Sequence, residues 1–231
     1  WTGHSYDDAH WQQAGKAIIP DGILSSQMIE PIRVTDTLKP ISITEPKPGV
    51  FIFDLGQNIT GWCRLKVTGP AGTVVYLRHA ETLLPEGTLS LANLRSAKAE
   101  EIYTLKGQGT EIWEPRFTSH GFRYVELTGF PGRPDINTIE GRMVNDDICT
   151  AGTFSCSNSL LNQIFKNIFW GLRGNYKTIP MDCPQRDERQ GWLGDRAEVM
   201  RGELFLFDVM SFYEKWLRDI RDAQLENGSI N

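Results

Sequence analysis

Residues 49–67 read GVFIFDLGQNITGWCRLKV, and this stretch decides what kind of fold the first two thirds of the chain adopts. Its two ends, at 49–53 and 63–67, are short runs rich in β-branched and aromatic residues, which is typical of strands. The polar stretch between them, 54–62, predicts a turn that packs against the helical part of the chain, with a ligand-binding loop as the alternative. Charged residues alternate with apolar ones in the second run, so one of its faces is expected to meet solvent.

Similar short segments continue along the chain. The clearest lie at 73–77, 101–105 and 122–127, separated by turns rich in Gly and Pro such as 69–72. Strand follows strand without a long helix between them, which does not fit a parallel α/β sheet. The sequence therefore predicts an antiparallel β-sandwich of two sheets over residues 31–151.

From residue 152 onward the apolar residues follow the 3.6-residue period of helices, and only helices are expected there. Ser157 and Asn158 are natural N-cap residues for the first helix. Gly174 and Pro180 bring it to an end. Its apolar stripe consists of Leu161, Ile164, Phe165, Ile168, Phe169 and Leu172.

Two more helices are expected after the first. The second covers about 194–206, and the third begins near Asp208 and ends at the C-cap signal Asn227-Gly228. The apolar face of the third carries Val209, Phe212, Tyr213, Trp216, Leu217 and Ile220. Three such helices alone would leave much apolar surface uncovered, so they predict the opening part of a larger all-α domain.

The first thirty residues fit neither pattern. Trp1 and Trp11 stand in a mixed polar stretch, which suggests the end of a preceding domain or a linker. The expected organisation is therefore a tail or linker at 1–30, a β-sandwich domain at 31–151 and an incomplete helical domain at 152–231.

The overall composition excludes several classes of partner. The chain has 231 residues and a net charge of −5, without a basic cluster or an RNA-stacking motif, so nucleic acid is not an expected partner. No apolar run is long enough to cross a bilayer, so we expect no membrane insertion. No signal peptide is visible at the N-terminus, and we expect a soluble protein whose compartment the sequence leaves open.

The cysteines do not indicate a metal site. Cys63, Cys149, Cys156 and Cys183 have neither a Cys-x-x-Cys spacing nor a close His/Cys cluster at zinc spacing. We therefore expect no metal and no cofactor. Cys149 and Cys156 are close enough in sequence to pair across a turn, although buried free thiols are the more common outcome.

The residues that could carry chemistry concentrate in DCPQRDERQGWLGD, residues 182–195. Four carboxylates, two arginines and a tryptophan lie between two helices, and the Pro and Gly residues favour a shaped loop. Asp195 would lie in the first turn of the next helix, where the helix dipole stabilises its negative charge. Charge-rich loops are also commonly solvated and salt-bridged, so composition alone leaves a binding site and a surface loop equally open.

These residue types suit a sugar. Carboxylates accept hydrogen bonds from adjacent hydroxyls, an arginine donates a fork in return, and Trp192 offers an apolar face. Glycoside hydrolysis needs a carboxylic acid that is still protonated near neutral pH, and neighbouring carboxylates favour that state. Arg186 and Arg189 would oppose it if they faced the same group.

The stretch 182–195 resembles the signature at the start of the catalytic domain in glycoside hydrolase family 78, the bacterial α-L-rhamnosidases. The resemblance covers roughly residues 31–231 and is specific through its combination of motifs. The other motifs are Phe53-Asp54-Leu55-Gly56-Gln57-Asn58 with Gly61-Trp62, Arg78-His79-Ala80-Glu81, Phe117-Thr118-Ser119-His120-Gly121-Phe122-Arg123-Tyr124 and Trp216-Leu217-Arg218-Asp219.

This resemblance implies a catalytic (α/α)6 toroid that hydrolyses terminal α-L-rhamnosides with inversion. It implies that Glu188 is the general acid and that Asp182, Arg186, Trp192 and Asp195 line the rhamnose pocket. The general base would be a glutamate later in the toroid, outside this chain, so the chain alone is expected to be inactive. The expected partners are a rhamnose-containing glycoside or polysaccharide and the missing remainder of the catalytic domain, in a bacterial cytoplasm or periplasm.

Other interpretations stay open beside this one. His79 and His120 are more often structural groups than ligands or bases. Cys183 is expected to pack and not to act as a nucleophile, and Asp187 has no assigned role. The alternative functions are a non-catalytic carbohydrate-binding module, which would not need the acidic loop, and a toroid glycosidase of different specificity.

Overall fold

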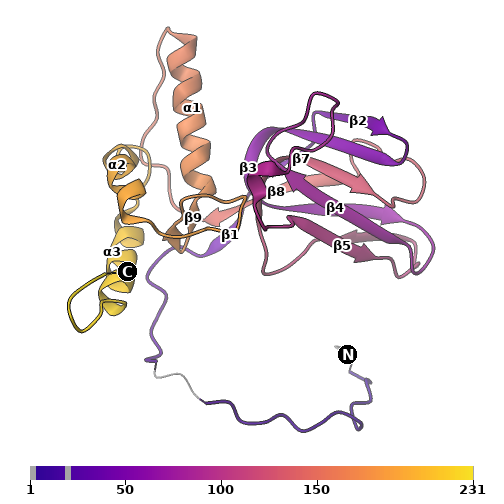
Figure 1. Ribbon diagram of the computed structural model, residues 1–231, viewed down its shortest axis with the longest axis horizontal. Helices are drawn as coiled ribbons and strands as arrows, with labels where there is room; N and C mark the ends of the chain where they lie inside the picture. Colours follow the sequence, from indigo (N-terminus) through magenta and orange to yellow (C-terminus); the bar gives the residue numbers. More distant parts are fainter. Residues whose placement is uncertain (1–3, 19–21, 231) are drawn as a thin grey trace.

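The computed structural model describes residues 4–18 and 22–230 of the chain. A curled β-sheet forms one side of the molecule and a group of helices forms the other (Figure 1). The described residues before Ile32 contain neither a helix nor a strand, and they lead as an extended segment into the sheet. Trp1, which the sequence assigns to the end of a preceding domain, lies outside the described residues.

The main sheet has eight strands in the described part of the chain. These strands are β1 (Ile32–Leu38), β2 (Ser42–Lys47), β3 (Val50–Thr68), β4 (Val74–Ala80), β5 (Glu100–Thr104), β6 (Thr110–Trp113), β7 (His120–Thr128) and β8 (Ile139–Asp146). A short 3-10 helix, η1 (Ala92–Leu94), lies between β4 and β5. All the pairings within this sheet are antiparallel, which confirms that part of the prediction for residues 31–151.

Strand β3 is 19 residues long and bends in its middle, so it belongs to both layers of the sheet. Its first arm pairs with β2, its second arm pairs with β6 and β8, and β7 pairs with both arms. The register of β3 against β7 shifts between Asp54 and Ile59, and Gly56 has a φ of 72°. A register shift of this kind bends a strand, and only glycine adopts such a φ without cost.

The bend corrects the prediction of two separate sheets. The segment expected to be a turn, 54–62, is a bend inside one continuous strand. The two layers are therefore parts of a single sheet that folds over on itself, and the sandwich is a curled sheet.

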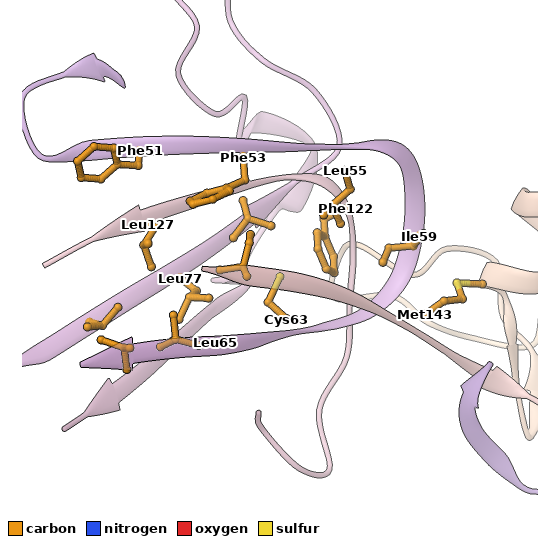
Figure 2. Close-up of a cluster of buried hydrophobic side chains, with 14 of the residues drawn as sticks. Phe51, Phe53, Leu55, Ile59, Cys63, Leu65, Leu77, Phe122, Leu127 and Met143 are labelled. Atoms are coloured by element: carbon orange, nitrogen blue, oxygen red, sulfur yellow. The ribbon is translucent and has the colours of Figure 1, made fainter. Parts of the chain in front are cut away.

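The hydrophobic core of the sheet lies between the two arms of β3. Figure 2 shows Phe51 and Phe53 on one arm facing Cys63 and Leu65 on the other. Phe53, Leu65 and Phe122 have no exposed surface. Burial of one such side chain contributes about 1.5–3 kcal/mol, so this core is a main source of the stability of the sheet.

Helix α1 (Ser159–Gly174) begins where the sequence predicts. Asn158 is its N-cap, and the side-chain oxygen accepts hydrogen bonds from two backbone N–H groups of the first turn. The helix ends against the bend of β3, where a Cβ added to Gly174 would lie 2.9 Å from the hydroxyl oxygen of Thr60. This close approach confirms that the 54–62 segment packs against the helices.

A hairpin of two short strands separates α1 from α2. It consists of β9 (Tyr176–Lys177) and β10 (Ile179–Pro180), so the expectation of helices alone after residue 152 is wrong here. At its tip, the N–H of Thr178 donates to a carboxylate oxygen of Asp146 at 2.6 Å. This bond ties the hairpin to the end of β8.

The last two helices differ from the prediction mainly at the C-terminal end. Helix α2 (Leu193–Glu203) falls close to the predicted range, and α3 (Met210–Asp222) begins near the predicted start. It ends before Asn227-Gly228, so the expected C-cap is wrong. Those two residues form a separate turn, in which the N–H of Gly228 donates to the carbonyl of Leu225 at 2.8 Å.

The helices bury only part of their apolar surface, as the sequence predicts. Phe207 and Phe212 belong to a small core of their own, at 2% and 0% exposure. On the outer face of α1, however, Leu161, Ile164 and Ile168 are 47%, 44% and 49% exposed. None of the helices in the described ranges has the length and apolar character that crossing a bilayer requires.

Candidate active site

The acidic loop, residues 181–192, connects β10 to α2. Its ends are joined by two hydrogen bonds between Asp182 and Gln190. The N–H of Asp182 donates to the carbonyl of Gln190 at 2.9 Å, and the N–H of Gln190 donates to Oδ1 of Asp182 at 2.6 Å. Asp182 therefore closes the loop and holds the residues between these two points in a fixed arrangement.

Three of the predicted site residues meet at the carboxylate of Glu188. The Nη2 atom of Arg186 lies 2.8 Å from Oε2 of Glu188 and 3.7 Å from Oδ2 of Asp182. The indole N–H of Trp192 donates to Oε1 of Glu188 at 2.9 Å. The structure thus brings Asp182, Arg186, Glu188 and Trp192 together around one carboxylate.

The environment of Asp182 and Cys183 fixes their ionisation states. Burial raises the pKa of Asp182, but hydrogen bonds from the Cys183 thiol and from the N–H of Gln190, with the charge of Arg186, lower it below its ordinary value. Burial raises the pKa of the Cys183 thiol, and the hydrogen bond to Asp182 acts in the same direction. At neutral pH Asp182 is an anion and Cys183 a protonated thiol, which agrees with a packing role for Cys183.

Three polar atoms of this cluster are buried without a hydrogen-bond partner among the described residues: Oδ2 of Asp182, Nε of Arg186 and Oε2 of Glu188. The two carboxylate oxygens are acceptors and the guanidinium nitrogen is a donor. Buried polar atoms in native proteins nearly always have partners, and those that have none in an active site are available to a ligand. A sugar hydroxyl satisfies either kind of atom, because it both donates and accepts.

The same cluster includes the atoms that a metal would use. One such atom each from Asp182, Cys183 and Glu188 lies within 4.8 Å of the others. Positive charge is already supplied at this point by the guanidinium group of Arg186, which pairs with both carboxylates. A protonated thiol is also a poor metal ligand. The expectation of no metal site stays a prediction.

Asp195 lies in the first turn of α2, where the sequence places it. Its side chain is exposed, and no hydrogen bond or ion pair links it to another described residue. Of the predicted site residues, it is the one that the structure does not connect to Glu188.

Arg189 lies on a different side of the loop from Glu188. Its Nε donates to the carbonyl of Arg186 at 3.0 Å. Its side chain lines a hollow of about 960 Å³ together with Trp62 and Phe117 of the sheet region. Of the two arginines of this loop, Arg186 pairs with Glu188 and Arg189 does not.

The connection between β4 and β5 contributes two residues that the sequence does not single out. Arg95 directly follows η1, and its Nη1 lies 3.0 Å from Oε2 of Glu188 and 4.0 Å from Oδ1 of Asp187. Ser96 donates to Oδ2 of Asp187 through its hydroxyl and through its N–H, the latter at 3.4 Å. Ser96 and Asp187 are 91 positions apart, and no local pattern distinguishes Arg95 from other exposed arginines.

Gly121 of β7 provides a second contact between the sheet and the acidic loop. A Cβ added there would lie 2.8 Å from Cγ of Pro184 and 2.9 Å from the backbone nitrogen of Gln185. The loop therefore lies directly on the strand, and only glycine leaves room for it. Gly121 belongs to the 117–124 motif, which is the signal in the sequence that points to this strand.

The histidines of the sheet keep their contacts within it, as predicted for structural groups. His79 is fully buried and its Nδ1 lies 3.0 Å from the carbonyl oxygen of Ala99. Burial, with a smaller contribution from His120, lowers the pKa of His79 to about 3. His120 places Nε2 2.7 Å from a carboxylate oxygen of Glu101.

The cysteines are all free. Cys63 and Cys183 are buried, as expected for Cys183. Cys149 and Cys156 do not pair, but both are exposed, so the expectation of buried thiols is wrong for these two.

Two family profiles match this chain. One is described as the bacterial alpha-L-rhamnosidase concanavalin-like domain and matches residues 44–145. The other is described as the bacterial alpha-L-rhamnosidase 6 hairpin glycosidase domain and matches residues 149–231. The first range falls within the curled sheet and the second contains the helices and the acidic loop.

Individual relatives agree with the profiles. An alpha-L-rhamnosidase of Streptomyces avermitilis is 47% identical over 100% of this chain, and one of Formosa agariphila is 41% identical over 100%. The structure of alpha-L-rhamnosidase from Dictyoglumus thermophilum superposes with a TM-score of 0.94 at 48% identity, over 98% of this chain and 26% of that one. The S. avermitilis structure, complexed with L-rhamnose, gives 0.93 at 46%, over 98% and 22%.

The match covers only part of each relative. This chain spans 22% of the S. avermitilis protein and 25% of the F. agariphila protein, which is about a quarter of their length.

Proposed function

This chain belongs to the bacterial α-L-rhamnosidases, a family of glycoside hydrolases, and from that premise we propose that it carries the acid half of an inverting rhamnosidase site. In this proposal Glu188 is the general acid for hydrolysis of terminal α-L-rhamnosides. Asp182, Arg186, Trp192 and Asp195 bind the sugar.

The observation that carries the proposal is that Arg186 and Trp192 both contact the carboxylate of Glu188, in a loop whose ends Asp182 joins. A surface loop has no need to turn two carboxylates toward one guanidinium group or to leave Oδ2 of Asp182 buried without a partner. Trp192 is 47% exposed, and its ring offers a flat face to the ring carbons or the methyl group of rhamnose.

The proposed reaction needs two carboxyl groups with different tasks. Protonated Glu188 gives its proton to the glycosidic oxygen while the bond from that oxygen to C1 of rhamnose breaks. A water molecule, deprotonated by a general base, attacks C1 from the opposite face, and the products are β-L-rhamnose and the free alcohol. The proton that Glu188 loses is replaced from solvent before the next turnover.

The spacing of the carboxylates argues that Asp182 is not the base. Inverting glycosidases hold their two carboxyl groups roughly 6.5–9.5 Å apart, to leave room for the water. Oxygen atoms of Asp182 and Glu188 lie within 4.8 Å of each other. Asp182 therefore serves in binding, and we place the base in a part of the catalytic domain beyond this chain.

The helices support a larger catalytic domain of the (α/α)6 toroid type. Apolar side chains of α1 and α2 are exposed on faces that further helices would cover, among them Ile164, Ile168 and Val199. The proposed partners of this chain are therefore the remainder of the catalytic domain and a rhamnose-containing glycoside or polysaccharide.

The test is the Glu188→Gln variant of the full-length enzyme that contains this chain. Loss of general acid help is expected to lower kcat about 10²–10⁴-fold on a rhamnoside of an alkyl alcohol. The loss is expected to be much smaller on a rhamnoside of dinitrophenol, because that leaving group departs without a proton. Glu198→Gln is the matched control, since Glu198 is an exposed glutamate on α2.

Proton NMR of the first product formed tests the stereochemistry, and β-L-rhamnose is the expected anomer. Retained activity of Glu188→Gln on the alkyl rhamnoside would remove Glu188 from the acid role. Binding of rhamnose by the wild-type enzyme, without turnover of any rhamnoside, would favour a non-catalytic carbohydrate-binding function.

A further inference from the structure

We propose that Arg95, which lies in the connection between β4 and β5 of the curled sheet, positions the general acid Glu188, so that the sheet domain is a working part of the rhamnosidase site. The inference rests on the acid role proposed for Glu188. It assigns a task to a contact between the two regions of the molecule that the catalytic proposal does not use.

The segment before Arg95 holds this residue in place. Leu94 is 2% exposed, and the side chain of Asn93 donates to Oε2 of Glu81, just after β4, at 2.9 Å. Glu81 in turn accepts from the side chain of Asn58, at the bend of β3, at 2.9 Å. The φ of Arg95 is 55°, a conformation that costs a non-glycine residue about 1–3 kcal/mol and persists only when the surroundings impose it.

Asp187 joins the acidic loop to the same segment. Its carboxylate accepts hydrogen bonds from the hydroxyl and the N–H of Ser96, the residue next to Arg95. The hydrogen bond from the Ser96 hydroxyl lowers the pKa of Asp187, so Asp187 is an anion at neutral pH. Asp187, which has no role in the sequence analysis, thus fixes the loop beside Arg95.

Two guanidinium groups, which form ion pairs, and one hydrogen-bond donor surround the carboxylate of Glu188. Arg95 and Arg186 reach Oε2 at 3.0 and 2.8 Å, and Trp192 reaches Oε1 at 2.9 Å. Arg186 and Trp192 belong to the acidic loop and move with it. Arg95 comes from the β4–β5 connection, which Leu94 and Asn93 hold against the sheet, and it therefore fixes where Glu188 lies relative to a part of the molecule that has a closed core.

This position matters to the reaction in two ways. Misplacement of a catalytic group by about 1 Å can cost about 10²-fold in rate, and Arg95 restrains the carboxyl group directly. When Glu188 gives up its proton it becomes a carboxylate, and a second guanidinium group stabilises that negative charge as it forms. Both effects act on the step in which the proton is transferred.

The experiment compares Arg95→Ala and Arg95→Lys in the full-length enzyme, with Arg133→Ala as the matched control. Arg133 is an exposed arginine of the sheet region, and it pairs with Glu45 at 3.4 Å. Each variant is assayed on a rhamnoside of an alkyl alcohol and on a rhamnoside of dinitrophenol, and its thermal unfolding is followed in parallel.

Arg95→Ala is expected to lower kcat on the alkyl rhamnoside about 10- to 100-fold, with little change in KM. The loss on the dinitrophenyl rhamnoside is expected to be much smaller, because that substrate does not need the proton. Arg95→Lys is expected to recover part of the rate, since it keeps the charge without the planar fork. Arg133→Ala is expected to match the wild type on both substrates.

Equal losses on the two substrates would show a merely structural role and overturn the inference, as would unchanged rates in Arg95→Ala. If Arg95→Ala does not fold, Ser96→Ala provides the same test, because it loosens the loop and leaves Arg95 in place. A smaller loss of rate in Ser96→Ala that is confined to the alkyl rhamnoside supports the inference. The absence of any loss in that variant overturns it. Failure of the wild-type enzyme on both substrates refutes the proposed function itself.

Discussion

The curled sheet and the helices of this chain differ in how completely they bury their apolar side chains. Phe53 and Leu65 in the sheet have no exposed surface, whereas Leu160 and Ile164 on α1 are 65% and 44% exposed. The acidic loop lies where the two regions meet, because it joins a hairpin to a helix and rests on Gly121 of the sheet. The difference teaches that the sheet has a closed core against which the acidic loop rests, while the helices beside the proposed site leave apolar faces uncovered.

The largest expected effect concerns the helices and the acidic loop, the part of the molecule whose apolar side chains are incompletely buried. The 231-residue chain by itself is not expected to hydrolyse an aryl α-L-rhamnoside. A full-length enzyme that hydrolyses the same substrate is the control. The chain contains the proposed acid, Glu188, but the proposed base lies outside it, and loss of acid–base help costs about 10²–10⁴-fold per group. The exposed helix faces also leave the sugar site without the walls that exclude water and hold the substrate.

The measurement is release of the aryl alcohol by the purified chain. Robust turnover would contradict the proposal that this chain holds only half of the site. It would require a general base among the carboxylates of this chain.

The next effect tests whether the two regions differ in stability as they differ in burial. Phe53→Ala empties part of the closed core and is expected to lower the free energy of unfolding by about 3–5 kcal/mol. Ile164→Ala, on the exposed face of α1, is expected to change it by about 0.5 kcal/mol or less. Urea denaturation of both variants of this chain gives the comparison. A similar cost at the two positions would mean that the face of α1 is covered.

The regular elements were largely predictable because their signals are local. Asn158 caps α1 as predicted, since an N-cap needs only the residues of the next turn. The end of α3 was predicted wrongly at Asn227-Gly228, because the same dipeptide closes a separate turn with Leu225. A favourable cap residue does not show whether the helix reaches it.

The folding of the sheet was less predictable. The strand pattern indicates which residues point inward, but it does not indicate that Asp54 and Ile59 are joined by a bend within one strand. Strand pairing depends on contacts between distant segments, and the glycine at 56 reads equally well as a turn or as a bend.

The site divides in the same way. Asp182, Arg186, Glu188 and Trp192 lie within eleven positions, and their grouping was expected from one stretch of sequence. The contact of Arg95 with Glu188 was not predictable, because it depends on how the loop rests on the sheet. Only the three-dimensional fold brings those two residues together.

A smaller effect is expected at the seam between the two regions. Gly121→Ala adds a methyl group 2.8–2.9 Å from Pro184 and Gln185, and the overpacking is expected to cost about 1–3 kcal/mol or to lift the acidic loop. Gly171→Ala is the matched control on α1, where nothing lies within 4 Å of the added carbon. Because alanine favours a helix, that change is expected to stabilise by up to about 1 kcal/mol.

Thermal unfolding of the two glycine variants gives the sign of each effect. A neutral or stabilising result for Gly121→Ala, without any change in protease cleavage of the acidic loop, would mean that the loop is not seated on β7.

The smallest expected effect concerns ion pairs on the two regions and their dependence on pH. Asp54 of β3 accepts two hydrogen bonds from Arg123 of β7, at 2.7 and 2.8 Å. These bonds are the main reason that the pKa of Asp54 lies below its ordinary value of 3.8, although burial opposes them. On α3, Glu214 accepts one hydrogen bond from Arg218, and both side chains are more than half exposed.

The sign of the pH effect follows from the lowered pKa of Asp54. The folded state binds a proton at Asp54 less readily than the unfolded state, so the pair stabilises the fold above about pH 3.8 and loses this contribution as pH falls through the folded pKa. Asp54→Asn is therefore expected to cost about 1 kcal/mol near neutral pH, and the difference from the wild type is expected to shrink below about pH 3.8. Glu214→Gln is expected to cost about 0.5 kcal/mol or less near neutral pH, because water screens an exposed pair.

Denaturant unfolding at neutral and at acidic pH measures the stability difference of each variant from the wild type. A cost for Asp54→Asn that stays constant with pH would show that the carboxylate charge is not what Arg123 recognises. An equal cost for Glu214→Gln would show that the ion pair of the sheet contributes no more to stability than the exposed pair of the helix.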